Sequence, residues 1–384
     1  MDMIYADYAA TTPVDKRVID AMMPYLTDVF YNAASSHAAG MQAQHAVMKS
    51  RMEIAGHIGA RMNEIVFTSG ATEAINLAVL GAARAARSEG GSGRTTIVTA
   101  HAEHAAVRDT AEYCAEHGFD VVWLPVDADG RIDLAAAALL INTSTILVSS
   151  MAVNNETGVM QDLKAISALA HARGALFMTD ATQAYGKLPL NVDELGIDLM
   201  TFSAHKIYGP KGVGALFTRA RKEQTCVLEP LMYGGGQERG MRSGTLNVPG
   251  IVGLATAGTI ALAEHAEESA RIRAYRDRFE QAMLTLPNVS INGSGAERGY
   301  NISNVCFHGV DADRLLIGMP HVACSKGSAC SSAKPKPSPV LTAMGRSEAD
   351  AHSSLRFSFG RFTTEADVDR LINDIMTVMT NMTL

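Results

Sequence analysis

Short apolar runs rich in β-branched residues alternate with longer helical stretches between residues 64 and 218. Seven of these runs have the length and composition of strands, and they read EIVFTSG, TTIVTAH, DVVWLPV, STILVSSMAV, ALFMTDA, LMTFSAH and GVGALFT. The stretch ATEAINLAVLGAARAAR follows the first run and favours a helix. Alternation of this kind is typical of an α/β protein. We therefore predict a mainly parallel, seven-stranded sheet flanked by helices.

The pattern changes after residue 250. A long helical pattern begins there, strand-like segments follow near NVSINGSG and NISNVCFHG, and a final helix closes the sequence. The final helix is predicted from apolar residues at three- and four-residue spacing, which form one face: Val368, Leu371, Ile372, Ile375 and Met379. We predict a large domain over residues 16–254 and a smaller α+β domain made of residues 1–15 and 255–384.

Composition and charge limit the possible locations and partners. With 384 residues and 47% hydrophobic content, the chain has enough apolar material for a sizeable core. The longest uncharged apolar stretch, Val248 to Ala263, is shorter than the roughly 20 residues that span a bilayer. The start of the sequence lacks the features of a signal peptide, which predicts a cytoplasmic protein. A net charge of -7 provides no overall attraction for nucleic acid, so neither nucleic acid nor membrane is an expected partner.

The five cysteines form no C-x-x-C pair, and their odd number argues against a disulfide framework and a zinc site. We predict no metal. Cys330 lies in the segment GSACSSAKPKPSP, whose glycine, serines and prolines predict an exposed loop at about 324–340. Lys326, Lys334 and Lys336 would favour the thiolate of Cys330. The alternative is an unreactive small residue, but cysteine prefers burial and this polar surrounding does not suit it. Cys324 follows an apolar segment and is interpreted as structural.

Three strand ends carry candidate chemistry. In FTSGATEAIN, backbone N–H groups and a hydroxyl meet at a helix N-terminus, which suits a phosphate group; an ordinary capped helix explains this segment equally well. In ALFMTDATQ, a buried strand ends at Asp180, which could cap the next turn or pair with a protonated pyridine nitrogen. In LMTFSAHKIYGPKG, Lys206 follows a third strand and could be a solvated surface lysine.

The combination is harder to explain than any one signal. Pyridoxal 5'-phosphate (PLP) needs a site for its phosphate, an acid for its ring nitrogen and an amine for its aldehyde, and the strand ends supply all three in that order. A dinucleotide site has less support, because the G-x-G at Gly212 and Gly214 has Phe217 where the third glycine belongs. PLP is therefore the predicted cofactor.

Eight segments together resemble the cysteine desulfurases, which are class V aminotransferase-like, fold-type I PLP-dependent transferases: SGATEAIN, AEHAAV, VNNETG, DATQ, SAHKIYGPKG, GGGQERGMRSGTLN, GSACSSA and LRFSFGRF. The matches run in the family's order from ADYAATTP to GRFTTEADVD and cover almost the whole sequence. The long GSACSSAKPKPSP segment resembles the group I enzymes of iron-sulfur cluster assembly and tRNA thiolation. One departure is that Asn32 is followed by Ala33, where the family commonly has proline.

The resemblance implies a role for each matching residue. Lys206 corresponds to the lysine that binds the PLP aldehyde, Cys330 to the nucleophile, and His104 to the histidine that stacks on the ring and assists proton transfer. His101 is the less favoured histidine. The other implied cofactor contacts are Ala71, Thr72, Asn155, Asp180, Gln183, Ser203, His205 and Thr245, and the implied substrate contacts are Asn32, Asn155 and Arg356. Thr245 corresponds to a residue that reaches the phosphate from the neighbouring subunit, which implies a homodimer.

The implied reaction converts L-cysteine to L-alanine and leaves a persulfide on Cys330 for a sulfur-acceptor protein. Iron-sulfur scaffolds, tRNA-modifying enzymes and DNA-sulfur-modifying systems all remain open as acceptors. Two other classes also remain open: a selenocysteine lyase or class V aminotransferase that does not need Cys330, and a sulfur carrier or cluster scaffold without PLP chemistry.

Overall fold

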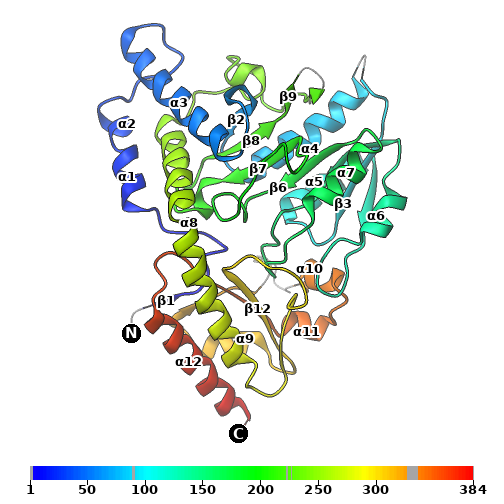
Figure 1. Cartoon of the computed structure of the whole chain (residues 1–384), viewed down its shortest axis with the longest axis vertical. Helices are drawn as coiled ribbons and strands as arrows, with labels where there is room; N and C mark the ends of the chain where they lie inside the picture. The colour runs from blue at the N-terminus through cyan, green and yellow to red at the C-terminus, as the bar shows by residue number, and fades with distance from the viewer. Residues whose placement is uncertain (1–2, 89–90, 222–223, 226, 327–335, 384) are drawn as a thin grey trace.

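A seven-stranded sheet forms the centre of the larger part of the molecule (Figure 1). The structure is a computed structural model that describes residues 3–88, 91–221, 224–225, 227–326 and 336–383. The strands lie in the order β2 (Ile65–Thr68), β8 (Gly214–Thr218), β7 (Leu199–Ser203), β6 (Leu176–Asp180), β5 (Thr145–Ser149), β3 (Thr96–Ala100) and β4 (Asp120–Leu124). Strand β8 runs antiparallel to β2 and β7, and all the other neighbouring pairs are parallel. The predicted mainly parallel sheet is confirmed.

Helices cover both faces of this sheet. Side chains that are adjacent on a strand point to opposite faces. Met178 therefore packs in one apolar cluster with residues of α4, while Phe177 packs in another with residues of α3, α7 and α8. Burial on both faces explains why the sequence shows continuous apolar runs instead of an alternating pattern. The helices of this part are α1 (Lys16–Met22), α2 (Pro24–Thr27), α3 (Ala38–His57), α4 (Ala71–Arg87), α5 (Ala105–Glu116), α6 (Leu134–Leu140) and α7 (Leu163–His171).

A smaller antiparallel sheet lies below the large one in Figure 1 and consists of β11 (Val289–Ile291), β12 (Ile302–Phe307) and β14 (Ser354–Ser358). It shares an apolar core with α9 (Ala312–Gly318) and α12 (Glu365–Thr383). Val368, Leu371 and Ile375 of α12 are buried in that core, as predicted for the final helix. Near it lie a parallel pair, β1 (Ile4–Tyr5) with β13 (Val322–Ala323), and two short helices, α10 (Pro339–Ala343) and α11 (Glu348–His352).

The long helix α8 (Val248–Met283) connects the two parts. Its first half packs in the core of the large sheet and its second half in the core of the small one. The domain boundary expected at residues 254 and 255 thus falls within one continuous helix, and the division remains a prediction. No helix among the described residues is long and apolar enough to cross a membrane. The remaining elements are β9 (Ala220–Arg221), β10 (Gln224–Thr225) and the 3-10 helices η1 (Met62–Glu64), η2 (Ala204–Lys206) and η3 (Glu238–Gly240).

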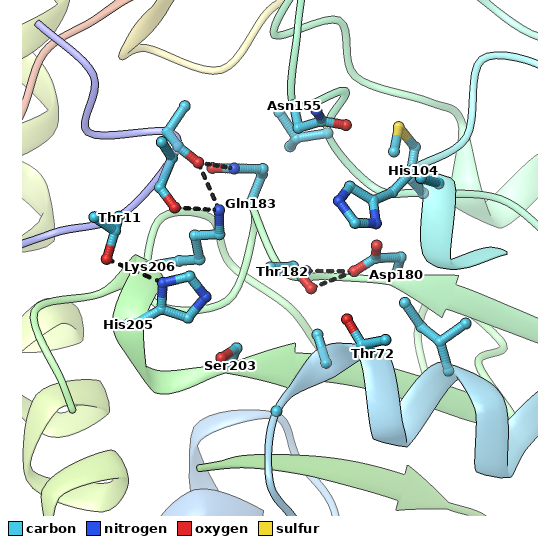
Figure 2. A pocket seen from close by; sticks show the side chains of 18 of the residues that line it. Thr11, Thr72, His104, Asn155, Asp180, Thr182, Gln183, Ser203, His205 and Lys206 are labelled. Carbon is cyan, nitrogen blue, oxygen red and sulfur yellow. Dashed lines mark hydrogen bonds between the residues drawn. The ribbon is translucent and has the colours of Figure 1, made fainter. Parts of the chain in front are cut away.

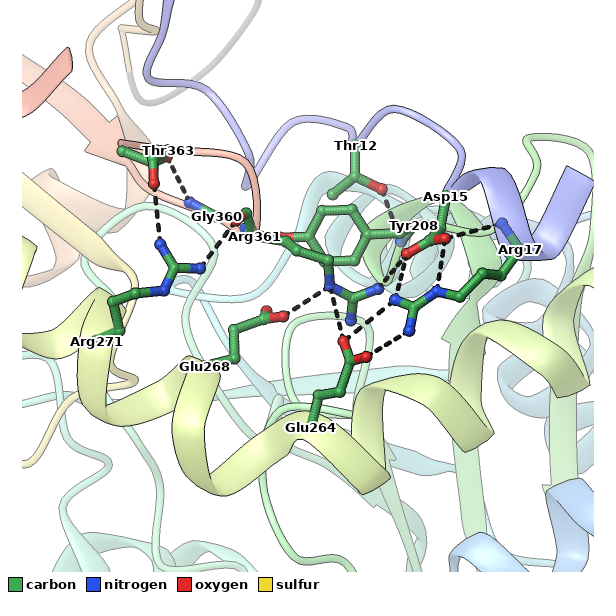
Figure 3. Close-up of polar contacts among 10 residues, drawn as sticks. All are labelled: Thr12, Asp15, Arg17, Tyr208, Glu264, Glu268, Arg271, Gly360, Arg361 and Thr363. Carbon is green, nitrogen blue, oxygen red and sulfur yellow. Dashed lines mark hydrogen bonds and ion pairs between the residues drawn. The ribbon is translucent and has the colours of Figure 1, made fainter. Parts of the chain in front are cut away.

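Charged residues connect the two parts around α8 (Figure 3). The guanidinium of Arg361, which follows β14, donates to Asp15 and to Glu268 of α8, both at 2.7 Å. Arg17 also pairs with Asp15, at 2.7 Å, and hydrogen bonds from Arg17 hold the pKa of the Asp15 carboxyl well below its ordinary value. The backbone N–H of Arg361 donates to the hydroxyl of Tyr208, two residues after Lys206. The N-terminal segment, α8 and the C-terminal part are thus held together next to the segment that carries Lys206.

We expect Arg361→Leu to lower the free energy of unfolding by about 3 kcal/mol, because it removes the guanidinium partner of the largely buried Glu268 and leaves the buried Asp15 with Arg17 alone. Arg278→Leu is the matched control. Arg278 pairs with Glu365 and Asp369, but its side chain is 41% exposed, so its loss should cost less than about 1 kcal/mol. Equilibrium urea unfolding of both variants tests the difference, and equal losses would show that the network adds nothing beyond a surface pair.

Candidate active site

A cavity of about 740 Å³ opens at the carboxyl ends of the central strands, where open α/β sheets bind their ligands. It is lined by ten of the residues that the sequence singled out: Ala71, Thr72, His104, Asn155, Asp180, Gln183, Ser203, His205, Lys206 and Arg356. Two others, Asn32 and Thr245, are exposed and are not among the lining residues. Cys330 lies outside the described residues.

The N-terminus of α4 forms one wall of the cavity. The first backbone N–H groups of a helix have no carbonyl partner within it, so those of Ala71 and Thr72 can receive an anion. Strand β8 passes very close to this turn: a Cβ atom on Gly214 would lie 2.7 Å from Cα of Gly70, so only glycine fits there. The hydroxyl of Ser203 lies near the same turn, 3.8 Å from where a Cβ atom on Gly70 would be, and also lines the cavity.

Asp180 ends β6 and is 5% exposed. The backbone N–H of Thr182 donates to its Oδ1 at 2.9 Å and the Thr182 hydroxyl donates at 2.5 Å. Both bonds go to one carboxylate oxygen, and Figure 2 shows the other turned toward the side of the cavity where His104 lies. Thr182 thus fixes the rotamer of Asp180, and the second oxygen remains able to pair with a cationic ligand group. The DATQ motif contains Thr182, but the sequence analysis assigned it no role.

His104 is the N-cap residue of α5. Its Nδ1 accepts a hydrogen bond from the backbone N–H of Ala106 at 3.1 Å, so in the neutral ring the proton is on Nε2. Burial lowers the pKa of His104 below its ordinary value, which favours that neutral form. The less favoured His101 instead stacks on Trp123, with ring centroids 4.1 Å apart, and does not line the cavity.

Lys206 is positioned by the N-terminal segment. Its ammonium donates to the backbone carbonyls of Ala9 and Ala10, each at 2.7 Å, as Figure 2 shows. Burial, with a further contribution from the charge of Arg356, lowers the pKa of Lys206 to about 8. At neutral pH a usable fraction of the amine is therefore uncharged, which a nucleophile or general base requires. An ordinary surface lysine would not show this environment.

Two hydrogen bonds, one at each end of its amide group, fix the orientation of the Gln183 side chain. Its amide Nε2 donates to the carbonyl of Ala9 at 2.8 Å, and its Oε1 accepts from the ammonium of Lys187 at 3.0 Å. Burial lowers the pKa of Lys187 to about 7. Lys187 orients Gln183, and nothing in the sequence indicates this contact, because a lysine four residues after DATQ is expected to be exposed to solvent.

Arg356 of β14 is buried, so its side chain does not point to solvent. Its guanidinium donates to the carbonyl of Asn155 at 2.8 Å and to the carboxylate of Asp7 at 2.7 Å. Its Nε and the side-chain Oδ1 of Asn155 have no hydrogen-bond partner within the described ranges. Two buried polar atoms at one end of the cavity thus remain able to contact a ligand. Asp7 was not singled out from the sequence.

Glu103 is a further buried acid beside the cavity. Its Oε1 accepts from the backbone N–H of Met151 at 2.5 Å, whereas Oε2 has no partner in the described part of the chain. Burial, and then the charge of Asp180, raises the pKa of Glu103 to about 8. It can therefore remain protonated at neutral pH next to a charged Asp180. In the sequence, only its position directly before His104 in AEHAAV points to Glu103, and that position alone indicates no function.

The described chain stops at Lys326, at the edge of the cavity, and resumes at Lys336. Ser325 and Lys326 both line the cavity, and Lys326 forms an ion pair with Asp313. Farther on, the hydroxyl of Ser338 donates at 2.5 Å to Glu156, another lining residue. Cys324 packs against the smaller core, and burial raises the pKa of its thiol to about 12. Described residues on both sides of position 330 thus line the cavity or contact its lining, while Cys324 is poorly suited to form a thiolate.

Comparison with known proteins identifies the family. The model of the class-V aminotransferases matches residues 4–371. The chain belongs to the class-V aminotransferase family. It is 48% identical over 371 residues to the cysteine desulfurase IscS of Anaeromyxobacter sp. (strain Fw109-5), which covers 96% of this chain and 90% of that protein. The resemblance to cysteine desulfurases is therefore confirmed.

Solved structures of similar proteins agree with this fold. A NifS-like protein superposes with a TM-score of 0.91 at 33% identity and covers 98% of this chain and 99% of its own. SspA, determined in complex with cysteine, superposes with a TM-score of 0.82 at 35% identity and covers 94% of this chain and 99% of its own. The predicted fold class is thus confirmed along nearly the whole chain.

Proposed function

We propose that the protein is a PLP-dependent cysteine desulfurase that converts L-cysteine to L-alanine and carries the released sulfur as a persulfide on Cys330. The observation that carries this proposal is the meeting of Lys206, Asp180 and the N-terminus of α4 around one cavity in a chain nearly half identical to a cysteine desulfurase. A protein that only carried sulfur or displayed cysteines would have no use for a buried lysine with a lowered pKa beside a buried carboxylate.

The donor set of the cavity fits PLP. The N–H groups of Ala71 and Thr72, with Ser203 and His205, would hold the phosphate. Asp180 would pair with the ring nitrogen, Gln183 would bond the ring hydroxyl, and the amine of Lys206 would bind the aldehyde. His104 and Asn155 would contact the ring. When bound, PLP supplies an electron sink that stabilises negative charge on the Cα of an amino acid.

Residues at the other end of the cavity would hold the amino acid. The guanidinium of Arg356 is already turned by Asp7 and by the carbonyl of Asn155, and its buried Nε is available to a carboxylate. We assign the carboxylate of L-cysteine to Arg356 and to the side chain of Asn155. The family resemblance places Asn32 at the substrate. Because Asn32 does not line the cavity of its own chain, it would have to contact the substrate in a second subunit.

Lys206 and His104 would move protons. Lys206 can take the Cα proton because its amine has a pKa of about 8, close to the working pH of a general base. His104, held neutral with its proton on Nε2, can donate or accept a proton next to the reacting atoms. Asp180, oriented by Thr182, would keep the ring nitrogen protonated.

Cys330 would take the sulfur. Its thiolate attacks the sulfur of the substrate, so that the S–S bond forms as the Cβ–S bond breaks. The electron pair of the broken bond ends on Cβ, which takes up a proton, and the products are alanine and a persulfide on Cys330. Cys330 is four positions after Lys326, so an extended chain would let it reach at most about 14 Å from the cavity edge.

We also propose a homodimer that delivers sulfur to an acceptor protein. Exposed apolar side chains on α2, on α3 and in the segment before Thr245 support a subunit interface, among them Leu26, Met41, Met52 and Tyr233. Thr245 and Asn32, exposed in the single chain, would complete the cavity of the partner subunit. Lys336, next to the Cys330 segment, would favour an acidic surface on the acceptor, whether it is an iron-sulfur scaffold or a thiolation enzyme.

The proposal predicts equal amounts of alanine and sulfide from L-cysteine, because each turnover splits one Cβ–S bond. We would incubate the PLP-loaded protein with L-cysteine and a dithiol reductant and measure both products over time. A protein without bound PLP is the control and should release neither. An aminotransferase would instead yield a keto acid without sulfide, and that outcome would replace the proposed reaction while keeping the cofactor.

A further inference from the structure

Three different metal-ligating side chains meet at the end of the small sheet, away from the cavity described above. They are the thiol of Cys306 in β12, the imidazole of His308 directly after β12, and the carboxylate of Asp350 in α11. Their donor atoms all lie within 4.8 Å of one another. We propose that Cys306, His308 and Asp350 bind a divalent transition-metal ion, Zn²⁺ in preference to the others. This site is independent of the proposed desulfurase reaction.

The separations of the donor atoms fit tetrahedral coordination. Metal–ligand distances of about 2.0–2.3 Å imply about 3.5 Å between the sulfur and the nitrogen or oxygen ligands of a tetrahedral Zn²⁺ ion. The Cys306 sulfur lies 3.5 Å from His308 Nδ1 and 3.8 Å from Asp350 Oδ1. His308 Nδ1 and Asp350 Oδ1 are hydrogen-bonded at 2.6 Å and would have to separate by about 0.8 Å. His308 can make that movement because its side chain is 41% exposed.

Each flexible ligand is oriented by a second residue, as in built metal sites. The hydroxyl of Ser290, on β11 opposite Cys306, lies 2.8 Å from His308 Nε2. An ion would displace the proton that Nδ1 shares with Asp350, and the Ser290 hydroxyl could then accept from a proton on Nε2. The hydroxyl of Ser347 donates to Asp350 Oδ2 at 2.8 Å and leaves Oδ1 facing the sulfur. Exposure of His308 and Asp350 leaves room for water as the fourth ligand.

The same residues do not suit a catalytic triad. In a relay, the nucleophile and the carboxylate contact different nitrogens of the histidine. Here the thiol and the carboxylate both face Nδ1, so the three donors converge on one point. One thiolate, one imidazole and one carboxylate favour Zn²⁺ over Mg²⁺ or Ca²⁺, which prefer oxygen ligands alone.

A bound ion would link β12 to α11, the helix that lies in the sequence between the Cys330 segment and Arg356. It would connect the end of β12 to α11, which lies beside it in Figure 1. Helix α11 follows α10, the first helix after the Cys330 segment, and leads directly into β14, which carries Arg356. The ion would therefore stiffen this part of the small sheet and leave the reacting groups untouched.

The test uses the full-length, PLP-loaded protein without a polyhistidine tag, in a Cys330→Ala background that removes the thiol proposed to react. Co²⁺ alone is the first probe, because thiolate ligation gives a charge-transfer band and tetrahedral ligation gives strong visible bands. We expect a single Co²⁺ ion per chain with both features. Zn²⁺ affinity is then measured by competition with a chromophoric chelator.

Four further variants decide the assignment. Cys306→Ser should abolish the charge-transfer band, and Asp350→Asn and Ser290→Ala should each weaken Zn²⁺ binding by about 10- to 100-fold. The control His352→Asn removes a neighbouring histidine that contacts Glu348 and should change nothing. Unchanged PLP absorbance in every variant shows that the fold is intact. The proposal is overturned if the starting protein binds no Co²⁺ or Zn²⁺, or if Cys306→Ser binds with the same spectrum and affinity.

Discussion

Lys206→Ala is expected to lower desulfuration of L-cysteine by about 10⁴-fold, the upper end of what a positioned proton-transfer group contributes. The loss is large because one amine is proposed both to bind the PLP aldehyde and to remove the Cα proton. The measurement is sulfide and alanine release at saturating L-cysteine and PLP. Borohydride treatment gives a second readout: the cofactor should stay attached through denaturation in the wild type and be lost from the variant.

Lys211→Ala provides the control, because Lys211 also lines the cavity but is exposed and has no assigned role. It should retain activity within about tenfold of the wild type, since an exposed charge contributes little. The lowered pKa of Lys206 gives an independent check. The uncharged amine becomes more abundant as the pH rises, so PLP capture by the cofactor-free protein should accelerate up to about pH 8 and then level off. Activity of Lys206→Ala within tenfold of the wild type would remove Lys206 from the mechanism.

The sequence predicts the large sheet well because burial on both faces produces continuous apolar runs. All seven runs became strands, and the helix expected over 71–87 is α4 with the same bounds. The reversed direction of β8 could not be predicted in this way, since an apolar run carries no information about its orientation. The single helix α8 is a similar case: the predicted domain division lies at residues 254 and 255, yet the helix continues through that point.

The site was predictable where a residue type at a strand end has a chemical reason. Asp180 and Lys206 follow strands that meet at one edge, and the cavity indeed contains both. Residues that orient other side chains of the site are not marked by any local sequence pattern. Asp7 reaches Arg356 from 349 positions away in the sequence, and the fold alone brings them together. The pKa shifts of Glu103 and Lys187 likewise come from burial, which no local pattern around them indicates.

Spacing rules also explain why no metal was predicted. Cysteine pairs at short spacing are the usual sign of zinc, and this chain has none. The proposed ligands include one cysteine and an aspartate 44 positions later, joined only because β12 and α11 pack together. A two-residue Cys-x-His spacing is too common to carry the inference by itself. The convergence of three donors in space is what carries it.

Cys330→Ala is expected to lower both alanine and sulfide release by about 10³-fold or more, because removal of a nucleophile leaves only the binding and polarisation of the substrate. The variant and the wild type must be compared at equal PLP occupancy, so that a folding defect is not mistaken for a chemical one. Mass spectrometry of the wild type after L-cysteine should show one added sulfur atom on the peptide that contains Cys330.

Cys324→Ala is the matched control for this variant, because it removes a thiol six positions earlier whose burial raises its pKa to about 12. It should keep most of the activity and should not prevent persulfide formation on Cys330. If Cys330→Ala instead keeps full activity, Lys206 and Asp180 retain their proposed roles around PLP, but the sulfur must leave without a persulfide on Cys330. The reaction would then be that of a lyase, and Lys326 and Lys336 would lose their reason to lie beside the Cys330 segment.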